Sequence, residues 1–122
     1  MSNEIQDRLR TTVKSIVAEL EGTDTDWWKE WLESNPDEGY TVDDTPRPHA
    51  YLEDALDIEY TMNSRGEYIG ARICVGLGGP NVYISTRFNR VEAYLGSEEF
   101  SWSFTDNLGL DDYLEEYFDA IR

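Results

Sequence analysis

The run Leu77-Gly78-Gly79-Pro80-Asn81 separates two apolar segments in which inward and outward side chains alternate. Two glycines, a proline with a fixed φ and an asparagine that tolerates a positive φ allow a chain to reverse its direction sharply. Alternation with a period of two is typical of a strand that has one buried face. The sequence therefore predicts a central hairpin at this run.

Both strands of this hairpin have a predicted inner face. In the first strand, Tyr68 to Leu77, the inner residues are Ile69, Ala71, Ile73, Val75 and Leu77, and the outer ones include Arg72 and Cys74. In the second strand the inner residues are Val82, Ile84 and Phe88. The glycines of the turn match neither a GxGxxG motif nor a P-loop, and no helix follows them, so we do not expect them to bind phosphate.

Three further segments alternate in the same way, and short turns such as Asn63-Ser64-Arg65-Gly66 separate them from their neighbours. Their predicted inner residues are Ile58, Tyr60 and Met62, then Val91, Ala93 and Leu95, and finally Phe100, Trp102 and Phe104. Five strands joined by short turns indicate an antiparallel meander with one buried face.

Amphipathic helices are predicted near both ends of the chain, because apolar residues recur there at helical spacing. Ser2 or Asn3 can cap the first helix, and Gly22 ends it. The apolar stripes are Ile5, Leu9, Val13, Ile16, Val17 and Leu20 in the first helix, and Leu110, Tyr113, Leu114, Tyr117, Phe118 and Ile121 in the last. The expected fold class is α+β, an antiparallel sheet of about five strands with both helices packed on one face.

The length of 122 residues fits a single domain. Within it, residues 1–50 form a helical N-terminal part with an acidic loop from Pro36 to Pro48, and residues 51–122 form the sheet and the C-terminal helix. A short helical turn from Tyr51 to Leu56 is expected to join the two parts.

Three tryptophans lie within five residues of a second predicted helix, which Thr23 or Thr25 can cap and Asn35-Pro36 ends. Tryptophan dominates the energetics of many interfaces, so Trp27, Trp28 and Trp31 could form a partner-binding surface. Large aromatic residues also supply much of the core of a small domain. The sequence leaves both interpretations open.

The charge of the chain is strongly negative, with 26 acidic and 10 basic residues and a formal net charge of −16. Such a surface repels nucleic acid and anionic membranes and attracts basic proteins. The single Cys74 excludes an internal disulfide and a cysteine-based zinc site. No apolar run is long enough to span a bilayer and no signal peptide is recognisable, so we expect a cytoplasmic protein.

We expect no catalytic residues, no metal and no cofactor. His49 is the only histidine, and no cysteine stands near it in the sequence. We therefore expect neither a Ser/His/Asp catalytic set nor a metal-binding cluster. The acids of the loop from Pro36 to Pro48 lack the calcium-binding D-x-D-x-D-G register. The expected role is therefore non-enzymatic.

The C-terminal helix carries the candidate partner-binding surface. Its acids are Asp111, Asp112, Glu115, Glu116 and Asp119, and no basic residue lies between Arg90 and Arg122. Five carboxylates along about 12 Å of helix give roughly one charge per 2.4 Å, against about one per 1.7 Å in B-DNA. The hypothesis is a DNA mimic that occupies a basic nucleic-acid-binding channel. Glu98 and Glu99, placed just ahead of the last strand, are expected to extend the surface.

Two alternatives stay open beside this hypothesis. One is an adaptor that binds a protein partner through Trp27, Trp28 and Trp31. The other is a domain whose acids serve only solubility or adaptation to salt, since a run of charge is usually a solvated face. A homodimer is also compatible with the sequence.

Several segments together carry a family resemblance: Ile58-Glu59-Tyr60, the run from Tyr68 to Arg72, the run from Leu77 to Ile84, and Val91-Glu92-Ala93-Tyr94-Leu95-Gly96. With the acidic last helix, they resemble a family of small acidic proteins of unknown function from bacterial plasmids, prophages and integrative elements. The resemblance covers about Leu56 to Ile121. It implies a counter-defence role, inhibition of CRISPR effectors or restriction enzymes, and brings no catalytic residues.

Overall fold

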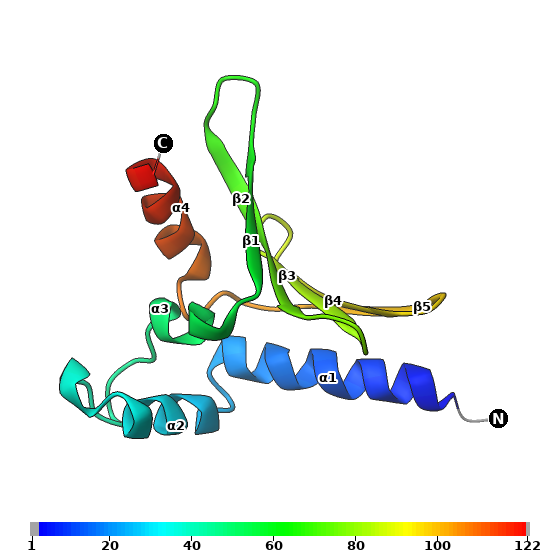
Figure 1. Cartoon of the computed structure of the whole chain (residues 1–122), viewed down its shortest axis with the longest axis horizontal. Helices are drawn as coiled ribbons and strands as arrows, with labels where there is room; N and C mark the ends of the chain where they lie inside the picture. Colours follow the sequence, from blue (N-terminus) through cyan, green and yellow to red (C-terminus); the bar gives the residue numbers. More distant parts are fainter. Residues whose placement is uncertain (1–2, 122) are drawn as a thin grey trace.

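Five antiparallel strands in sequential order form the sheet of this α+β fold (Figure 1). The structure is a computed structural model that describes residues 3–121. Its elements are α1 (Glu4–Glu21), α2 (Asp26–Ser34), η1 (Pro36–Glu38), α3 (Pro48–Tyr51), η2 (Leu52–Asp54), β1 (Asp57–Met62), β2 (Tyr68–Gly76), β3 (Asn81–Ser85), β4 (Arg90–Leu95), β5 (Glu98–Ser103) and α4 (Leu110–Ile121). The predicted five-stranded meander is confirmed.

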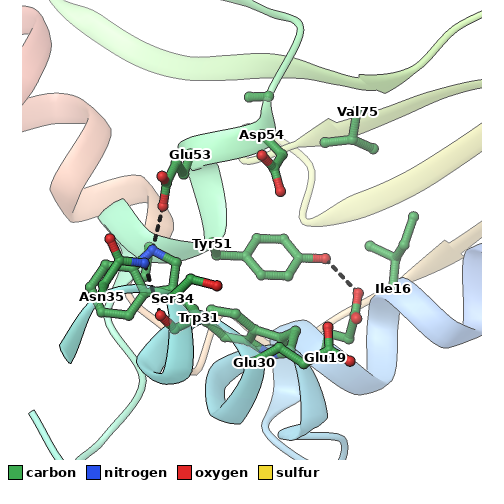
Figure 2. A pocket seen from close by; sticks show the side chains of 13 residues that line it. Ile16, Glu19, Glu30, Trp31, Ser34, Asn35, Tyr51, Glu53, Asp54 and Val75 are labelled. Atoms are coloured by element: carbon green, nitrogen blue, oxygen red, sulfur yellow. Dashed lines mark hydrogen bonds between the residues drawn. The ribbon is translucent and has the colours of Figure 1, made fainter.

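The two long helices cover the same face of the sheet at different places. α1 packs against β4 and β5, and α4 packs against β2 (Figure 1). The helix α2 and the short helices α3 and η2 lie beside the C-terminal end of α1, where they and the end of β2 enclose a pocket (Figure 2). The sheet thus has one covered face, as predicted.

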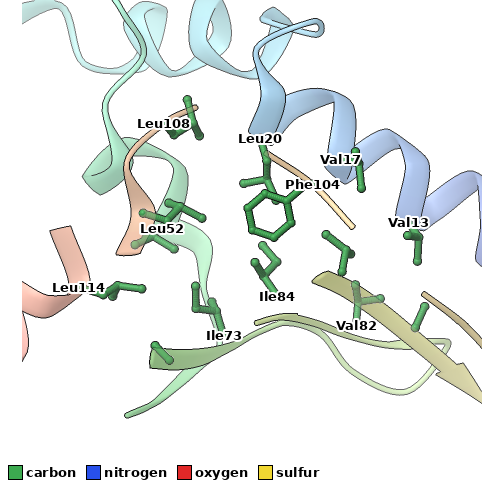
Figure 3. Close-up of a cluster of buried hydrophobic side chains, with 14 of the residues drawn as sticks. Val13, Val17, Leu20, Leu52, Ile73, Val82, Ile84, Phe104, Leu108 and Leu114 are labelled. Atoms are coloured by element: carbon green, nitrogen blue, oxygen red, sulfur yellow. The ribbon is translucent and has the colours of Figure 1, made fainter. Parts of the chain in front are cut away.

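The core fills the space between α1, α4 and the sheet (Figure 3). Cross-strand neighbours build a buried row across the sheet, because Ile73 pairs with Ile84 and Ile84 pairs with Val91. Leu9, Val13, Val17 and Leu20 of α1 and Leu110 and Leu114 of α4 close the cluster from above. Two thirds of the α1 stripe is therefore buried as the periodicity predicts; Ile5 is exposed and Ile16 is half-buried.

The ends of α1 follow the predicted capping rules. The backbone amide of Gln6 donates to Asn3 Oδ1 over 3.1 Å, which satisfies one free donor of the first turn. Gly22 adopts a left-handed conformation, with φ of 85°, and its amide bonds back to the last turn. Asn3 is thus the cap; Ser2, the alternative, lies outside the described residues, as does Arg122.

The central turn is held by side chains as well as by its own backbone. The Gly78 amide donates to Asn81 Oδ1 over 2.7 Å, and Arg8 of α1 donates to the Gly79 carbonyl, also over 2.7 Å. The second bond ties the turn to the N-terminal part of α1. The predicted reversal is therefore confirmed and is anchored from outside the hairpin.

Several residues predicted to face the core do not. A bulge shifts the register between Cys74 and Gly76, so β2 ends before Leu77, which is 65% exposed. β3 ends at Ser85, and Phe88 lies in the following turn, 66% exposed. Met62 follows a second register shift and is also exposed. Conversely Cys74, predicted to face outward, is buried.

Residues at the edges of the covered face are more exposed than predicted. Trp102 faces α1 but is 49% exposed, because β5 is an edge strand. Tyr117 and Ile121, at the margin of the α4 stripe, are also exposed. The helical turn predicted from Tyr51 begins earlier, at Pro48, whose fixed φ suits the first position of a helix. Among residues 3–121, no helix is long and apolar enough to cross a membrane.

The substitution Gly70→Ala tests the packing of β2 against the turn that follows β3. Gly70 has a φ of 150°, and a Cβ built on it would stand 2.5 Å from Arg87 Cβ and 2.8 Å from Arg87 Cα. Because backbone must move, we expect the free energy of unfolding to fall by about 2–4 kcal/mol in chemical denaturation.

The matched control is Gly76→Ala in the same strand. There the new Cβ would lie no closer than 3.4 Å to any neighbour, and φ is not left-handed. We expect a loss smaller by at least about 1 kcal/mol than at Gly70. Equal losses at the two positions would contradict the close approach of Arg87.

Candidate functional site

The acids of α4 share one face of the helix. At about 100° per residue, the five carboxylates predicted to form the surface fall within an arc of roughly 140°, opposite the buried stripe. Asp112, Glu115, Glu116 and Asp119 are exposed, and Asp111 is half-buried. The structure therefore brings these five together on one rigid element, which we call the α4 acidic face.

Apolar packing fixes the orientation of this face. Leu110, Leu114 and Phe118 of α4 are buried, and the Phe118 ring lies 5.5 Å from Tyr60 and 5.7 Å from Tyr68 between ring centroids. A helix anchored along this stripe cannot rotate without exposing it. The acidic face must therefore point away from the sheet.

Two hydrogen-bonded carboxylates hold the start of α4. Asp106 accepts from the Leu110 amide over 2.8 Å and from the Asp111 amide over 3.0 Å, which satisfies donors left free at a helix N-terminus. Asp111 accepts from the Tyr68 hydroxyl over 2.7 Å. Burial raises the pKa of the Tyr68 hydroxyl, the hydrogen bond with Thr86 lowers it in part, and the hydrogen bond to Asp111 raises it again. Asp111 thus has a structural partner, and no side-chain hydrogen bond of the other four acids is seen among residues 3–121.

The remaining α4 acids have no cationic partner within the part of the chain that the structure describes. The ion pairs there are Asp7 with Arg10, Glu67 with Arg65, and Glu92 with Arg72. Their carboxylates belong to other elements. Among residues 3–121, no ion pair therefore neutralises a carboxylate of the α4 acidic face.

Glu98 and Glu99 lie elsewhere. They are the first residues of β5 rather than ahead of it, at the far end of the molecule from α4 (Figure 1). Glu98 accepts from Gln6 Nε2 over 2.5 Å and from Asn3 Nδ2 over 3.3 Å, so it anchors the N-terminus of α1. The prediction that Glu98 and Glu99 extend the acidic face is therefore wrong, because β5 begins far from α4.

Basic side chains gather beside β5. The Arg10 guanidinium lies 5.6 Å from the Phe100 ring centroid, and the Lys14 ammonium lies 4.5 Å from that of Trp102. A cation over an aromatic face is attracted to it. These cations of α1 are therefore engaged at the end of the sheet away from α4, which leaves the charge unevenly distributed.

The three tryptophans of α2 have different environments. Trp28 is 1% exposed and stacks on Trp31, with 5.4 Å between ring centroids. Trp27 is half-buried and meets Tyr51 edge to face at 4.8 Å. Trp28 therefore belongs to the interior, while Trp27 and Trp31 line the pocket between α1, α2 and α3.

This pocket, of about 510 Å³, combines aromatic rings with carboxylates (Figure 2). The Tyr51 hydroxyl donates to Glu19 Oε1 over 2.8 Å, and the Trp31 indole N–H donates to Glu53 Oε2. Its lining residues are Ile16, Glu19, Trp27, Glu30, Trp31, Ser34, Asn35, Ala50, Tyr51, Glu53, Asp54, Ala55 and Val75. No basic side chain is among them. We call it the acidic aromatic pocket.

Burial raises the pKa of the Glu19 carboxyl, the Tyr51 hydrogen bond lowers it in part, and the charges of Asp24 and Glu30 raise it again. Burial is thus the main cause of the raised pKa, and the neighbouring negative charges add to it. Sequence reasoning missed this site because its parts come from separate elements, and the only local signal was the cluster of tryptophans.

His49 and the loop acids form no metal site in the structure. The His49 ring packs against Trp31 and Tyr40, with centroids at 5.6 and 6.2 Å. Among residues 3–121, no group of three or more histidine, cysteine or acidic side chains is placed to hold a metal ion.

The substitution pair Glu116→Gln and Asp119→Asn tests whether α4 carries uncompensated charge. Both acids lie near the C-terminal end of α4, where the helix dipole disfavours negative charge. We expect the double variant to unfold at higher denaturant concentration, by about 0.6–2 kcal/mol at low salt. The gain should shrink as salt is added.

Asp112→Asn is the control, because Asp112 lies in the first turn, where the dipole favours a negative charge. It should not stabilise the protein. An equal gain from Asp112→Asn would contradict the dipole argument and indicate general charge repulsion instead.

The substitution Glu19→Gln tests the electrostatics of the pocket. Because the pKa of Glu19 is raised in the folded state, the native protein holds this proton more firmly, and its stability falls as the pH rises from the unfolded pKa through the folded one. A glutamine oxygen still accepts from Tyr51 but cannot ionise. The stability of the variant relative to the parent should therefore increase between pH 4 and pH 7.5, the pH range of the denaturation series.

Tyr51→Phe provides the comparison for this series. It removes the hydrogen bond that lowers the pKa of Glu19, so the stability of Tyr51→Phe should fall more with pH than that of the parent. If the difference in unfolding free energy between Glu19→Gln and the parent were constant over the pH series, the pKa of Glu19 would not be raised by folding.

No protein-family model, curated protein or solved structure matches this chain. The resemblance to small acidic proteins of mobile elements therefore stays an expectation, and the functional conclusions depend on the arrangement of the side chains.

Proposed function

We propose that this protein is a non-enzymatic inhibitor that binds a basic, nucleic-acid-binding surface of a host protein complex. The observation that carries the proposal is the α4 acidic face, where four exposed carboxylates lie on one side of a firmly packed helix and form no ion pair within residues 3–121. A fixed array of negative groups can occupy the positions that phosphates take in a basic groove.

The rigidity of α4 supports this role. A flexible acidic tail would lose conformational entropy on binding, whereas carboxylates on a packed helix are already ordered. Only their side chains remain to be fixed. The four acids are also exposed, so a basic surface can reach them without a rearrangement of the fold.

The net charge of −16 supports the same role at longer range. Opposite charges steer two proteins together and raise the rate of association, and salt weakens this effect. With Arg10 and Lys14 of α1 engaged near β5, the α4 end would meet a basic partner first.

The family resemblance favours a defence complex of the host cell, a CRISPR effector or a restriction enzyme, as the partner. Such complexes hold nucleic acid in positively charged channels. The proposed place of action is accordingly the host cytoplasm.

The test is capture of host proteins on the immobilised protein, followed by displacement with duplex DNA. Asp112→Asn, Glu115→Gln, Glu116→Gln and Asp119→Asn are combined in one variant; Asp111 is kept because it bonds to Tyr68. We expect the Kd of the captured protein to rise at least about tenfold, since each interfacial charge contributes through desolvated contacts.

The control variant neutralises four exposed acids elsewhere, with the same change in net charge: Glu33→Gln, Asp37→Asn, Glu38→Gln and Asp43→Asn. Its affinity should fall much less. The proposal fails if both variants bind alike, or if saturating duplex DNA does not compete with the parent protein for the captured partner.

A further inference from the structure

The acidic aromatic pocket is lined by no residue of α4. Figure 2 shows Glu53 and Asp54 on one side of the Tyr51 ring and Glu19 and Glu30 on the other. The carboxylates come from α1, α2 and η2, so they converge only in the folded chain. Sites for ligands are commonly cavities of about 300–1,000 Å³ with a few polar groups among apolar walls, and this pocket has that form.

The walls are built to stay in place. The Trp31 indole N–H donates to Glu53, and the Asn35 amide donates to the Trp31 carbonyl over 2.8 Å. Trp31 also stacks on the buried Trp28. On the other side Tyr51 is held between Trp27 and Glu19. Aromatic faces and carboxylates are therefore presented together without a reorganisation of the pocket.

The chemistry of these walls selects a cation. Four carboxylates line the pocket, and no ion pair within residues 3–121 neutralises any of them. The raised pKa of Glu19 is consistent with this excess of negative charge. An anion would be repelled, and a neutral apolar group would leave the carboxylates desolvated and unpaired.

We propose that the acidic aromatic pocket binds an arginine side chain of a protein partner. A guanidinium is planar, stacks on aromatic rings and donates to carboxylates in pairs, so one group can contact the rings and the acids at once. Its aliphatic stem suits the apolar wall formed by Ile16, Ala55 and Val75. The site is independent of the α4 acidic face and stands even if α4 has another role.

The test uses the peptide acetyl-Gly-Arg-Gly-amide as probe and acetyl-Gly-citrulline-Gly-amide as its neutral analogue. Binding is followed by NMR through the indole N–H signals. We expect saturable shifts of Trp27 and Trp31 with the arginine peptide, while Trp102, on β5 at the far end of the sheet, serves as an internal reference. Tetramethylammonium distinguishes an arginine site from a site for free quaternary cations.

The variant Glu53→Gln/Asp54→Asn keeps an oxygen acceptor for Trp31 but removes two charges. We expect its affinity for the arginine peptide to fall at least about fivefold. The control Glu33→Gln/Asp37→Asn, with the same change in net charge on exposed acids outside the pocket, should change affinity by less than about twofold. An unchanged Trp28 indole signal verifies the fold of each variant.

Three results would overturn the proposal. The citrulline peptide could bind as well as the arginine peptide, the two double variants could lose affinity equally, or tetramethylammonium could bind more tightly than the arginine peptide. The first result would show that binding does not require a positive charge. The second would show that the peptide does not bind at this pocket. The third would show that the pocket does not prefer a guanidinium group. None of these measurements involves the partner of α4. The proposal for the pocket is therefore tested independently of the proposal for the α4 acidic face.

Discussion

The need to cover one apolar face of the sheet governs the arrangement of this protein. Strand alternation places Ile73, Ile84 and Val91 on the same side, and an uncovered row of this kind would be strongly unfavourable in water. α1 covers β4 and β5, while α4 covers β2. Each helix can do so only by turning its polar side to the solvent.

This constraint explains why the acids of α4 are so exposed and so poorly neutralised. The helix has no basic residue, and its buried stripe leaves only the outer arc for Asp112, Glu115, Glu116 and Asp119. Arg10 and Lys14 of α1 lie over aromatic rings of β5, at another part of the sheet. Within residues 3–121, no ion pair involves an acid of α4, so no neighbouring cation among them neutralises this face.

Local periodicity was enough to predict the sheet, both long helices and the α4 acidic face, because each depends on residues close in sequence. It failed at Leu77 and Phe88, where a bulge and an early strand end interrupt the alternation. It also failed for Glu98, because the distance between β5 and α4 is a property of the topology. The acidic aromatic pocket was beyond such reasoning, since residues more than thirty positions apart, such as Glu19 and Tyr51, meet there.

The pocket and the α4 acidic face have one physical property in common. In both, negative charge lies where it destabilises the folded protein. Glu116 and Asp119 oppose the helix dipole, and Glu19 is half-buried near other acids, with its pKa raised chiefly by burial. The indole N–H groups of Trp27 and Trp28 are also buried without a partner among the described residues. Local rules are usually broken at sites where function requires it, and the rest of the fold compensates. A cationic partner would relieve the charge repulsion at both sites, so binding would recover free energy that the isolated fold gives up.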